Sequence, residues 1–297
     1  MNDLILPKNQ FRISITSACN MKCVYCHNEG NTKCSVLTID KIRKLIEETY
    51  EFGLEEIRLT GGDPLIHPQL YNICEMIAEE FNLRIGINTN LIAYEKLKVL
   101  IDKGWIHRVV VGLDYFDGKI SKNSPIGKSS KEILENILKI KDKVDVSIAT
   151  VFNGDYDNIY SIVKWGIENG VRVKVIEIER NEICKTSDKD YLEMRDKLIN
   201  SFDFDIKVDD LEEINCYINN KKCVSFFPSL CRLRRCDLCK KIQLRVTSQG
   251  QVKSCLYYDD GDFSCYDEEV KNNVKKLLKS PVNYHYDPKL VIREENE

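Results

Sequence analysis

The sequence predicts an α/β fold built on a parallel sheet. Six strand-like runs alternate with amphipathic runs of helical length, and this order requires parallel strands joined by right-handed crossovers. The strand-like runs are rich in β-branched and aliphatic residues and are short enough to be buried on both faces. This order alone does not distinguish a partial barrel from an open sheet that helices cover on both sides.

The expected strands and helices can be given residue ranges, and capping residues mark the ends of several helices. The strands are expected at Phe11–Thr16, Glu56–Thr60, Leu83–Thr89, Arg108–Leu113, Val144–Val151 and Val171–Ile178. The helices are expected at Thr38–Phe52, Pro68–Phe81, Tyr94–Lys103, Ser130–Lys141, Asp155–Asn169 and Asp188–Ser201. Thr38 suits a helix N-cap, and glycines typical of a left-handed C-cap follow three helices, at Gly53, Gly104 and Gly170.

The alternation stops near residue 203, where short runs and clustered cysteines replace it. We therefore expect an α/β domain over residues 1–202 and a smaller, cysteine-rich C-terminal module over residues 203–297. Within that module, Gln243–Thr247 and Gln251–Leu256 are predicted to form a hairpin around the turn Ser248-Gln249-Gly250.

Composition limits the classes of function. A charged share of 31% with a net charge of −3 gives no basic surface for nucleic acid or for an acidic membrane. No apolar run reaches membrane-spanning length, and the first residues lack the pattern of a secretory signal peptide, so we expect a cytoplasmic protein. In that compartment thirteen cysteines, an odd number, suit metal binding better than disulfides.

Three cysteines, Cys19, Cys23 and Cys26, follow directly after the first expected strand. The loops after parallel strands form the edge at which α/β folds place their active sites. Three thiolates on a 4Fe–4S cluster leave one iron without a protein ligand, and a catalytic metal centre needs such an open position. The alternative is a structural zinc site with His27 as the fourth ligand, which is awkward because His27 directly adjoins Cys26.

The spacing C-x3-C-x2-C after a first strand resembles the motif of the radical S-adenosylmethionine (SAM) superfamily, whose enzymes use a 4Fe–4S cluster and SAM. Gly61-Gly62-Asp63-Pro64 is similar to the family's Gly-Gly-Glu-Pro element, which binds the amine of SAM's methionine. Gly112-Leu113-Asp114 resembles the Ser-Leu-Asp of relatives, with glycine in place of serine. This resemblance covers about residues 8–180 and implies a partial (βα)6 TIM-like barrel.

The same resemblance implies which residues contact SAM. An aromatic side chain just before the third cysteine is expected beside the adenine, and the ends of the third and sixth strands are expected to contribute further contacts. The residues expected to bind SAM are Tyr25, Gly61, Gly62, Asp63, Thr89, Asn90, Asp114 and Glu177.

A second group of cysteines, Cys231, Cys236, Cys239 and Cys255, lies around the predicted hairpin. By their chemistry four thiolates suit zinc or a second 4Fe–4S cluster equally. The expected presence of one 4Fe–4S cluster in the same chain favours the cluster over zinc. The region resembles the auxiliary-cluster region of the GTP 3′,8-cyclases of molybdopterin biosynthesis and, more loosely, that of SPASM/twitch enzymes.

Arg12 and Arg245 stand where those cyclases carry arginines that bind the triphosphate. Other expected cations are missing, since Gln243 replaces another arginine and Ile66-His67-Pro68 lacks the usual basic residue. A triphosphate needs several fixed cations. The resemblance therefore implies a cyclase-like enzyme whose substrate differs from GTP.

The leading hypothesis is an enzyme that reductively cleaves SAM to a 5′-deoxyadenosyl radical and abstracts hydrogen from a small molecule such as a nucleotide derivative. Its expected partners are that substrate and an electron donor such as ferredoxin or flavodoxin. The first alternative is a peptide-modifying enzyme with a twitch domain. Such enzymes often carry an N-terminal peptide-recognition domain, and the fact that fewer than a dozen residues precede the first strand counts against this alternative. The second is a non-enzymatic iron–sulfur redox or metal-binding protein, which would give Gly61-Gly62-Asp63-Pro64 no role.

Overall fold

Strands and helices alternate along the chain in the order that the sequence predicts. The computed structural model describes residues 4–23, 25–30, 33–116, 129–178, 187–231, 233–242, 244–256, 263–265 and 267–280. The chain groups into two compact units, one of Met1–Lys22, Cys26–Val109 and Cys236–Tyr284, the other of Cys23–Tyr25, Val110–Arg235 and His285–Glu297. These units follow spatial contacts, whereas the division expected at residues 202 and 203 follows the sequence pattern and stays a prediction.

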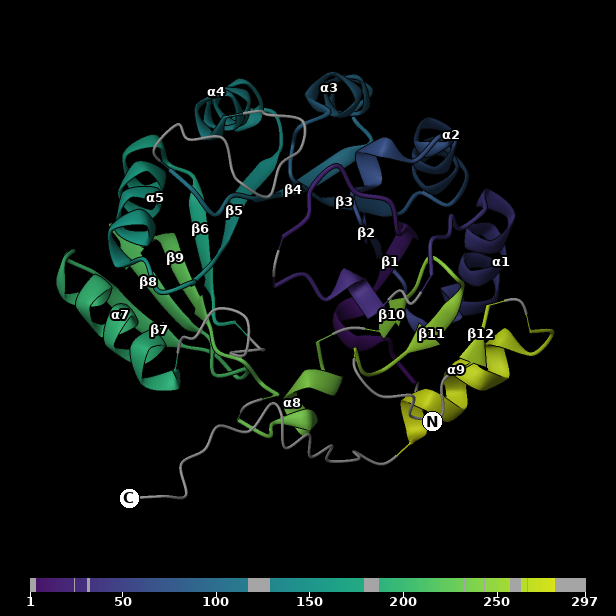
Figure 1. The fold of residues 1–297 in the computed structure, drawn as a ribbon. Helices are drawn as coiled ribbons and strands as arrows, with labels where there is room; N and C mark the ends of the chain where they lie inside the picture. The colour runs from purple at the N-terminus through teal and green to yellow at the C-terminus, as the bar shows by residue number, and fades with distance from the viewer. Residues whose placement is uncertain are drawn as a thin grey trace. The chain divides into compact units, whose positions relative to one another are not determined.

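The first unit contains the first three predicted strands and the helices that follow them. Its elements before residue 110 are η1 (Pro7–Asn9), β1 (Gln10–Thr16), η2 (Asn28–Gly30), α1 (Ile39–Thr49), η3 (Tyr50–Phe52), β2 (Glu56–Gly61), η4 (Pro64–Ile66), α2 (Leu70–Glu75), η5 (Met76–Glu80), β3 (Arg84–Thr89), α3 (Tyr94–Asp102) and the start of β4 (Ile106–Gly112). The C-terminal part of the chain adds α8 (Cys236–Lys240), β10 (Leu244–Val246), β11 (Gln251–Lys253), β12 (Phe263–Ser264) and α9 (Val270–Lys279). Helices α1, α2 and α3 lie along one face of β1, β2 and β3 (Figure 1).

Strands β1, β2 and β3 pair in parallel, and β10 joins the free side of β1 as a further parallel strand. Strands β11 and β12 continue the sheet in antiparallel order. The predicted hairpin is confirmed as β10 and β11, with Gly250 at a φ of 83° in its turn, while Gln243 lies outside the described residues. The cysteine-rich segment therefore extends the N-terminal sheet, an arrangement that the sequence pattern did not indicate.

The second unit repeats the same plan. Its elements are the end of β4, α4 (Ser130–Ile140), β5 (Asp145–Val151), α5 (Tyr156–Asn169), β6 (Arg172–Ile176), α7 (Asp188–Asn200), β7 (Asp205–Val208), β8 (Ile214–Ile218) and β9 (Lys221–Phe227). Strands β5, β6 and β9 are parallel, and β9, β8 and β7 are antiparallel to one another in turn. Strand β9 is therefore, after β10, a second parallel strand beyond the six expected from the sequence.

The helix boundaries follow local chemistry. Ser129 caps α4 in a capping box, and Asp155 caps α5 by accepting from the amide of Asn158 at 3.0 Å. Gly170 ends α5 in the left-handed conformation, with a φ of 67°. Thr38 does occupy the N-cap position of α1, but its side chain makes no capping hydrogen bond. Among the described residues, no helix has both the length and the apolar character needed to span a membrane.

Strand β1 separates an apolar face from a polar face. Phe11, Ile13 and Ile15 are fully buried and pack toward the helices, as the period of two in a strand requires. The opposite face, here called the polar face, carries Arg12, Ser14 and Thr16 from β1 and, by the register of the strands, Glu56, Arg58 and Thr60 from β2. The polar face is where the candidate site is built.

Candidate active site

The loop after β2 closes tightly on the loop after β1. The amides of Gly62 and Asp63 donate to the carbonyl oxygens of Thr16, at 2.7 Å, and Ala18, at 2.8 Å. A Cβ on Gly61 would lie 2.1 Å from the oxygen of Thr16, and one on Gly62 would lie 2.0 Å from that of Ala18. Only glycine permits so close an approach. The two glycines therefore hold the start of the cysteine loop against the end of β2.

The carboxylate of Asp63 connects the ends of β2 and β3. It is 1% exposed and accepts hydrogen bonds from the amides of Leu65 and Asn90, both at 2.9 Å, and from the hydroxyl of Thr89 at 2.8 and 3.0 Å. Burial raises the pKa of Asp63, although these donors favour the charged form. Because its acceptor positions are occupied, Asp63 acts as a positioning residue that holds Thr89 and Asn90 beside the Gly61-Gly62 turn.

Amide hydrogens point at two of the three N-terminal thiol groups. The amide nitrogen of Met21 lies 3.3 Å from Sγ of Cys19, and that of Asn28 lies 3.3 Å from Sγ of Cys26. Such contacts stabilise thiolates and tune cluster potentials, so these two positions fit cluster ligands. Among the described residues, no three His, Cys, Asp or Glu side chains are grouped closely enough to hold a metal ion. The ligand set of Cys19, half-buried Cys23 and Cys26 therefore stays a prediction.

Asparagine side chains lie near Cys19. The side-chain amide of Asn90 donates to Oδ1 of Asn20 and lies 3.9 Å from Sγ of Cys19. Two residues before Asn90, near the end of β3, Oδ1 of Asn88 is buried and has no hydrogen-bond partner among the described residues. A buried acceptor without a donor is costly in a folded protein. Asn88 is therefore placed to accept a hydrogen bond from a bound ligand.

Tyr25 and Asp114 form a pair in the second unit. The hydroxyl of Tyr25 donates to Oδ2 of Asp114, whose Oδ1 accepts from the amide of Val151 at 3.0 Å. The side chain of Asn158, on α5, donates to the backbone carbonyl of Asp114 at 2.6 Å. Burial, and then the charge of Asp114, raise the pKa of Tyr25 well above its ordinary value, so the phenol stays protonated at neutral pH. Thus the structure brings together two residues that the sequence assigned separately to SAM.

Glu177 has a different environment. It follows β6, is 6% exposed, and its Oε2 accepts from the amide of Ser229 at 2.7 Å, while its own amide donates to the carbonyl of Phe227 at 2.9 Å. These contacts join the end of β6 to the segment that precedes Cys231. In this structure Glu177 orders the loop after β9, and its contact with SAM stays a prediction.

The C-terminal cysteines lie on short local structures. Cys236 and Cys239 are on α8, and Cys255 follows β11 in the first unit. Cys231 belongs to the second unit, in a turn where the amide of Arg234 donates to its carbonyl at 3.1 Å. All four are half-buried. Their role as ligands of one metal centre stays a prediction.

Arg12 and Arg245 come together through an acid that the sequence analysis did not single out, and their role in binding a substrate stays a prediction. Both guanidinium groups bind the carboxylate of Glu29, which lies in η2 after the cysteine loop. Glu29 is 7% exposed. Nothing in the local sequence marks this residue as buried, but a strand that places arginine among apolar residues requires a counter-ion, and that was the available signal.

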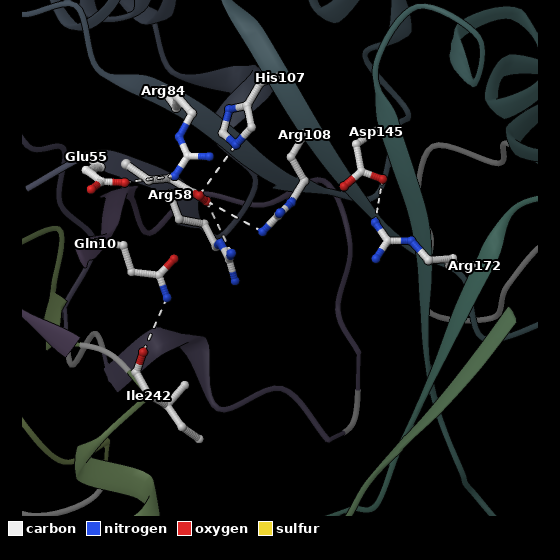
Figure 2. A network of polar contacts seen from close by, with 10 residues as sticks. Gln10, Glu55, Arg58, Arg84, His107, Arg108, Asp145, Arg172 and Ile242 are labelled. Atoms are coloured by element: carbon white, nitrogen blue, oxygen red, sulfur yellow. Dashed lines mark hydrogen bonds and ion pairs between the residues drawn. The ribbon is translucent and has the colours of Figure 1, made fainter. Parts of the chain in front are cut away.

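A second charged cluster on the polar face was also not predicted. Figure 2 shows Arg58, His107 and Arg108 turned toward one unlabelled carboxylate. It belongs to Glu56, whose oxygens lie 3.2, 3.4 and 3.9 Å from nitrogen atoms of these three residues in turn. Burial alone would raise the pKa of Glu56, but His107, Arg58 and Arg108 lower it to about 2. Gly86 on β3 leaves room for this carboxylate, since a Cβ there would lie 3.1 Å from Oε1 of Glu56.

The fold and the site together define a class of enzyme. A parallel α/β sheet presents a three-cysteine loop after its first strand, docked on a Gly-Gly-Asp-Pro turn after its second. Residues 13–165, more than half of the chain, match the radical SAM superfamily. The chain belongs to the radical SAM superfamily and is therefore an enzyme of that class.

Two curated relatives show which radical SAM enzymes this chain resembles. A probable GTP 3′,8-cyclase of Methanococcus maripaludis (strain C5) is 27% identical over 259 residues, which cover 84% of this chain and 85% of the relative. A GTP 3′,8-cyclase of Clostridium perfringens (strain 13) is 26% identical over 297 residues, which cover 92% of this chain and 90% of the relative. The resemblance to these cyclases that the sequence suggested is confirmed.

Solved structures support the fold. Streptococcus suis SuiB bound to S-adenosylmethionine is similar with a TM-score of 0.67 and 14% identity over 94% of this chain, which spans 65% of the SuiB chain. Native anSMEcpe with bound AdoMet and Cp18Cys peptide gives a TM-score of 0.56 and 16% identity over 92% of this chain and 84% of that one. At such identities the likeness concerns the fold, and it confirms the predicted TIM-like class.

Membership of the superfamily implies a 4Fe–4S cluster and SAM. The donors aimed at Cys19 and Cys26 and the unpartnered oxygen of Asn88 fit these groups. When bound, the cluster supplies the electron that breaks a carbon–sulfur bond of SAM. The contribution of the chain itself is positional, because the Gly61-Gly62 turn and Asp63 fix the loop and the strand ends around that site.

Proposed function

We propose that this protein is a cyclase-like radical SAM enzyme that forms a 5′-deoxyadenosyl radical and abstracts hydrogen from a small molecule such as a nucleotide derivative. The observation that carries the proposal is the docking of the cysteine loop on Gly61-Gly62-Asp63, within a chain that resembles GTP 3′,8-cyclases over most of its length. Ferredoxin or flavodoxin would supply the electron.

In this proposal the residues divide into three sets. Cys19, Cys23 and Cys26 hold the catalytic cluster. SAM lies against Tyr25, Gly61, Gly62, Asp63, Thr89, Asn90, Asp114 and Glu177. Among these, Asp63 and Asp114 act through their neighbours, since their oxygens are already engaged with protein donors. The substrate contacts the part of the polar face that carries Arg12 and Arg245.

A second 4Fe–4S cluster on Cys231, Cys236, Cys239 and Cys255 completes the proposal. Iron and sulfide analysis with EPR spectroscopy of the anaerobically reconstituted protein counts the clusters. We expect about eight irons per chain, and about four in the Cys19→Ala/Cys23→Ala/Cys26→Ala variant. Equal iron content in both proteins would refute the N-terminal cluster. An iron content of about four per chain in the wild type would refute the second cluster.

The activity test uses the reconstituted protein with dithionite and SAM under anaerobic conditions, with and without GTP. We expect 5′-deoxyadenosine from the wild type and none from the triple cysteine variant. If the wild type releases no 5′-deoxyadenosine, the proposed class of reaction is wrong for this chain. Formation of 5′-deoxyadenosine together with unchanged GTP would keep the class and exclude GTP as the substrate.

A peptide substrate is the second candidate, and one observation favours it. Arg12 and Arg245, the residues expected to bind a triphosphate, already share the carboxylate of Glu29. A peptide needs no such pair of free cations. The test is mass spectrometry of a short cysteine- or glycine-rich peptide encoded beside the gene, after incubation with the enzyme and SAM. A mass change that depends on SAM would favour the peptide over the nucleotide derivative.

A further inference from the structure

The guanidinium groups of Arg12 and Arg245 lie side by side on the polar face. Arg12 is on β1 and Arg245 on β10, and the register of these parallel strands makes the two residues direct partners. Register partners in a parallel sheet project to the same face. Both side chains are mostly buried, with exposed fractions of 18% and 19%. Two adjacent, fixed guanidinium groups make a site for one oxyanion.

Glu29 fills that oxyanion position. Its Oε2 accepts from Nε of Arg12 at 3.1 Å and from Arg245 at 3.0 Å. Its Oε1 accepts from a second nitrogen of Arg12 and from the hydroxyl of Thr60 at 3.2 Å. A carboxylate has about four lone-pair positions, and here four donors occupy them. Arg12 commits two of its N–H donors to Glu29 and Arg245 commits one, so any further anion would have to share these cations with a carboxylate that is already bound.

The backbone and the local charge keep this carboxylate in place. Glu29 has a left-handed φ of 51°, and its amide donates to Nδ1 of His27 at 3.0 Å. Burial opposes ionisation, but the adjacent guanidinium groups of Arg12 and Arg245 hold the pKa of Glu29 well below its ordinary value. Glu29 is therefore negatively charged at neutral pH. A di- or triphosphate placed here would face this charge at close range instead of two free cations.

The next arginine along the sheet is also engaged. Arg58 on β2 is the register partner of Arg12, and it donates to Glu56 at 3.2 Å. Glu56 is itself 5% exposed. Two carboxylates, Glu29 from η2 and Glu56 from β2, thus engage all three arginines in this row across β10, β1 and β2.

We infer that Glu29 is a specificity-determining residue that occupies the oxyanion position between Arg12 and Arg245 and excludes substrates with a di- or triphosphate. The substrate class that remains is neutral or carries a single anionic group, for instance a nucleoside rather than a nucleoside triphosphate. This inference rests on the proposed function, which places the substrate at these two arginines.

The experiment is calorimetric titration of sodium tripolyphosphate into the full-length, anaerobically reconstituted protein. We expect weak binding by the wild type and an affinity about 10-fold to 100-fold higher in Glu29→Gln, because two guanidinium groups become available to the anion. Glu47→Gln is the matched control, since Glu47 is exposed on α1 and its loss changes the net charge equally. Adding Arg12→Gln to Glu29→Gln should return the affinity to that of the wild type.

Two results would overturn the inference: tripolyphosphate binding by the wild type as tight as that of Glu29→Gln, or an equal gain in Glu47→Gln. If circular dichroism shows that Glu29→Gln does not fold, the wild type is compared with Arg12→Gln instead. If the wild type binds tripolyphosphate tightly and Arg12→Gln does not, the anion reaches Arg12 despite Glu29, and the inference is wrong. Formation of 5′-deoxyadenosine is measured in the same preparations. A wild type that fails to cleave SAM refutes the proposed function, whereas the titration needs no turnover and tests Glu29 alone.

Discussion

Asp63 and Glu29 are buried carboxylates of the same compact unit, and each ties a loop to the sheet. Asp63 is held by neutral donors, the amides of Leu65 and Asn90 and the hydroxyl of Thr89. Glu29 is held by two guanidinium groups and one hydroxyl. Their pKa values move in opposite directions, because burial dominates at Asp63 while nearby positive charge dominates at Glu29.

This contrast separates two ways of fixing a loop. Neutral donors hold Asp63 through geometry, so the site depends on how closely the β1 and β2 loops approach. Opposite charges hold Glu29, so its site depends on keeping the charges paired. The hydrogen bonds around Asp63, here called the neutral network, lie at the strand ends near the cysteine loop. The ion pairs of Glu29, here called the charged network, lie further along the polar face. The following predictions test whether the two sites respond as differently as their partners imply.

Removal of the Glu29 carboxylate should have the largest effect on stability. Glu29→Ala leaves two mostly buried guanidinium groups without their counter-ion, and we expect the free energy of unfolding to fall by about 3–5 kcal/mol. Urea unfolding of the wild type and the variant measures this. The double variant Glu29→Ala/Arg12→Ala should lose clearly less than the two single variants added together. Additive losses would show that the pair is not coupled.

Addition of a methyl group at Gly62 should come next. Its Cβ would lie 2.0 Å from the carbonyl oxygen of Ala18, a backbone atom that cannot turn away. We expect Gly62→Ala to cost about 3 kcal/mol or more and to lower the iron content after reconstitution, since the cysteine loop must shift. Gly104→Ala is the matched control, with positive φ but open space, and should cost only about 1 kcal/mol. Equal losses would refute the steric explanation.

Most of the β1–β3 framework could be predicted because its signals are local. The strand at residues 11–16 alternates buried apolar residues with polar ones, and Gly61-Gly62 follows the next strand directly. The cysteine spacing is likewise contained in eight residues. Patterns of this kind depend on neighbours in the sequence, so one chain is enough to detect them.

The remaining features depend on contacts between distant segments. Strand β10 pairs with β1 although more than two hundred residues separate Arg245 from Arg12 in the sequence. The partner of these arginines, Glu29, has the local sequence of an ordinary polar loop. Asp63 was expected to bind SAM, but its oxygens bind Thr89 and Asn90. Tertiary packing decides which donors each of these acids contacts. The periodicity of the sequence contains no information about such contacts.

Acid should separate the two kinds of carboxylate. Glu56 and Glu29 have lowered pKa values, so their contribution to stability is complete above the unfolded value of about 4.3 and is lost as the pH falls toward about 2. Asp63 has a raised pKa and so opposes that loss. We expect the reduced, iron-free chain to lose about 1–2 kcal/mol per lowered group. The measurement is the free energy of unfolding in urea as a function of pH. Below about pH 4.3 it should fall less steeply in Glu29→Gln than in the wild type, and more steeply in Asp63→Asn. The same pH dependence in both variants would show that the two carboxylates do not differ in this way.

The smallest effect is expected at Thr89, whose hydroxyl donates to both oxygens of Asp63. Thr89→Val keeps the shape of the side chain but removes this donor and also the acceptor of the Leu91 amide, while the amides of Leu65 and Asn90 remain on Asp63, so the loss should be about 1–2 kcal/mol. Thr38→Val is the matched control, because Thr38 caps α1 without a side-chain hydrogen bond and should lose almost nothing. Chemical unfolding of both variants measures the difference. If Thr89→Val cost as much as Glu29→Ala, the neutral network would be as tightly coupled as the charged one, and the division between the two sites would be wrong.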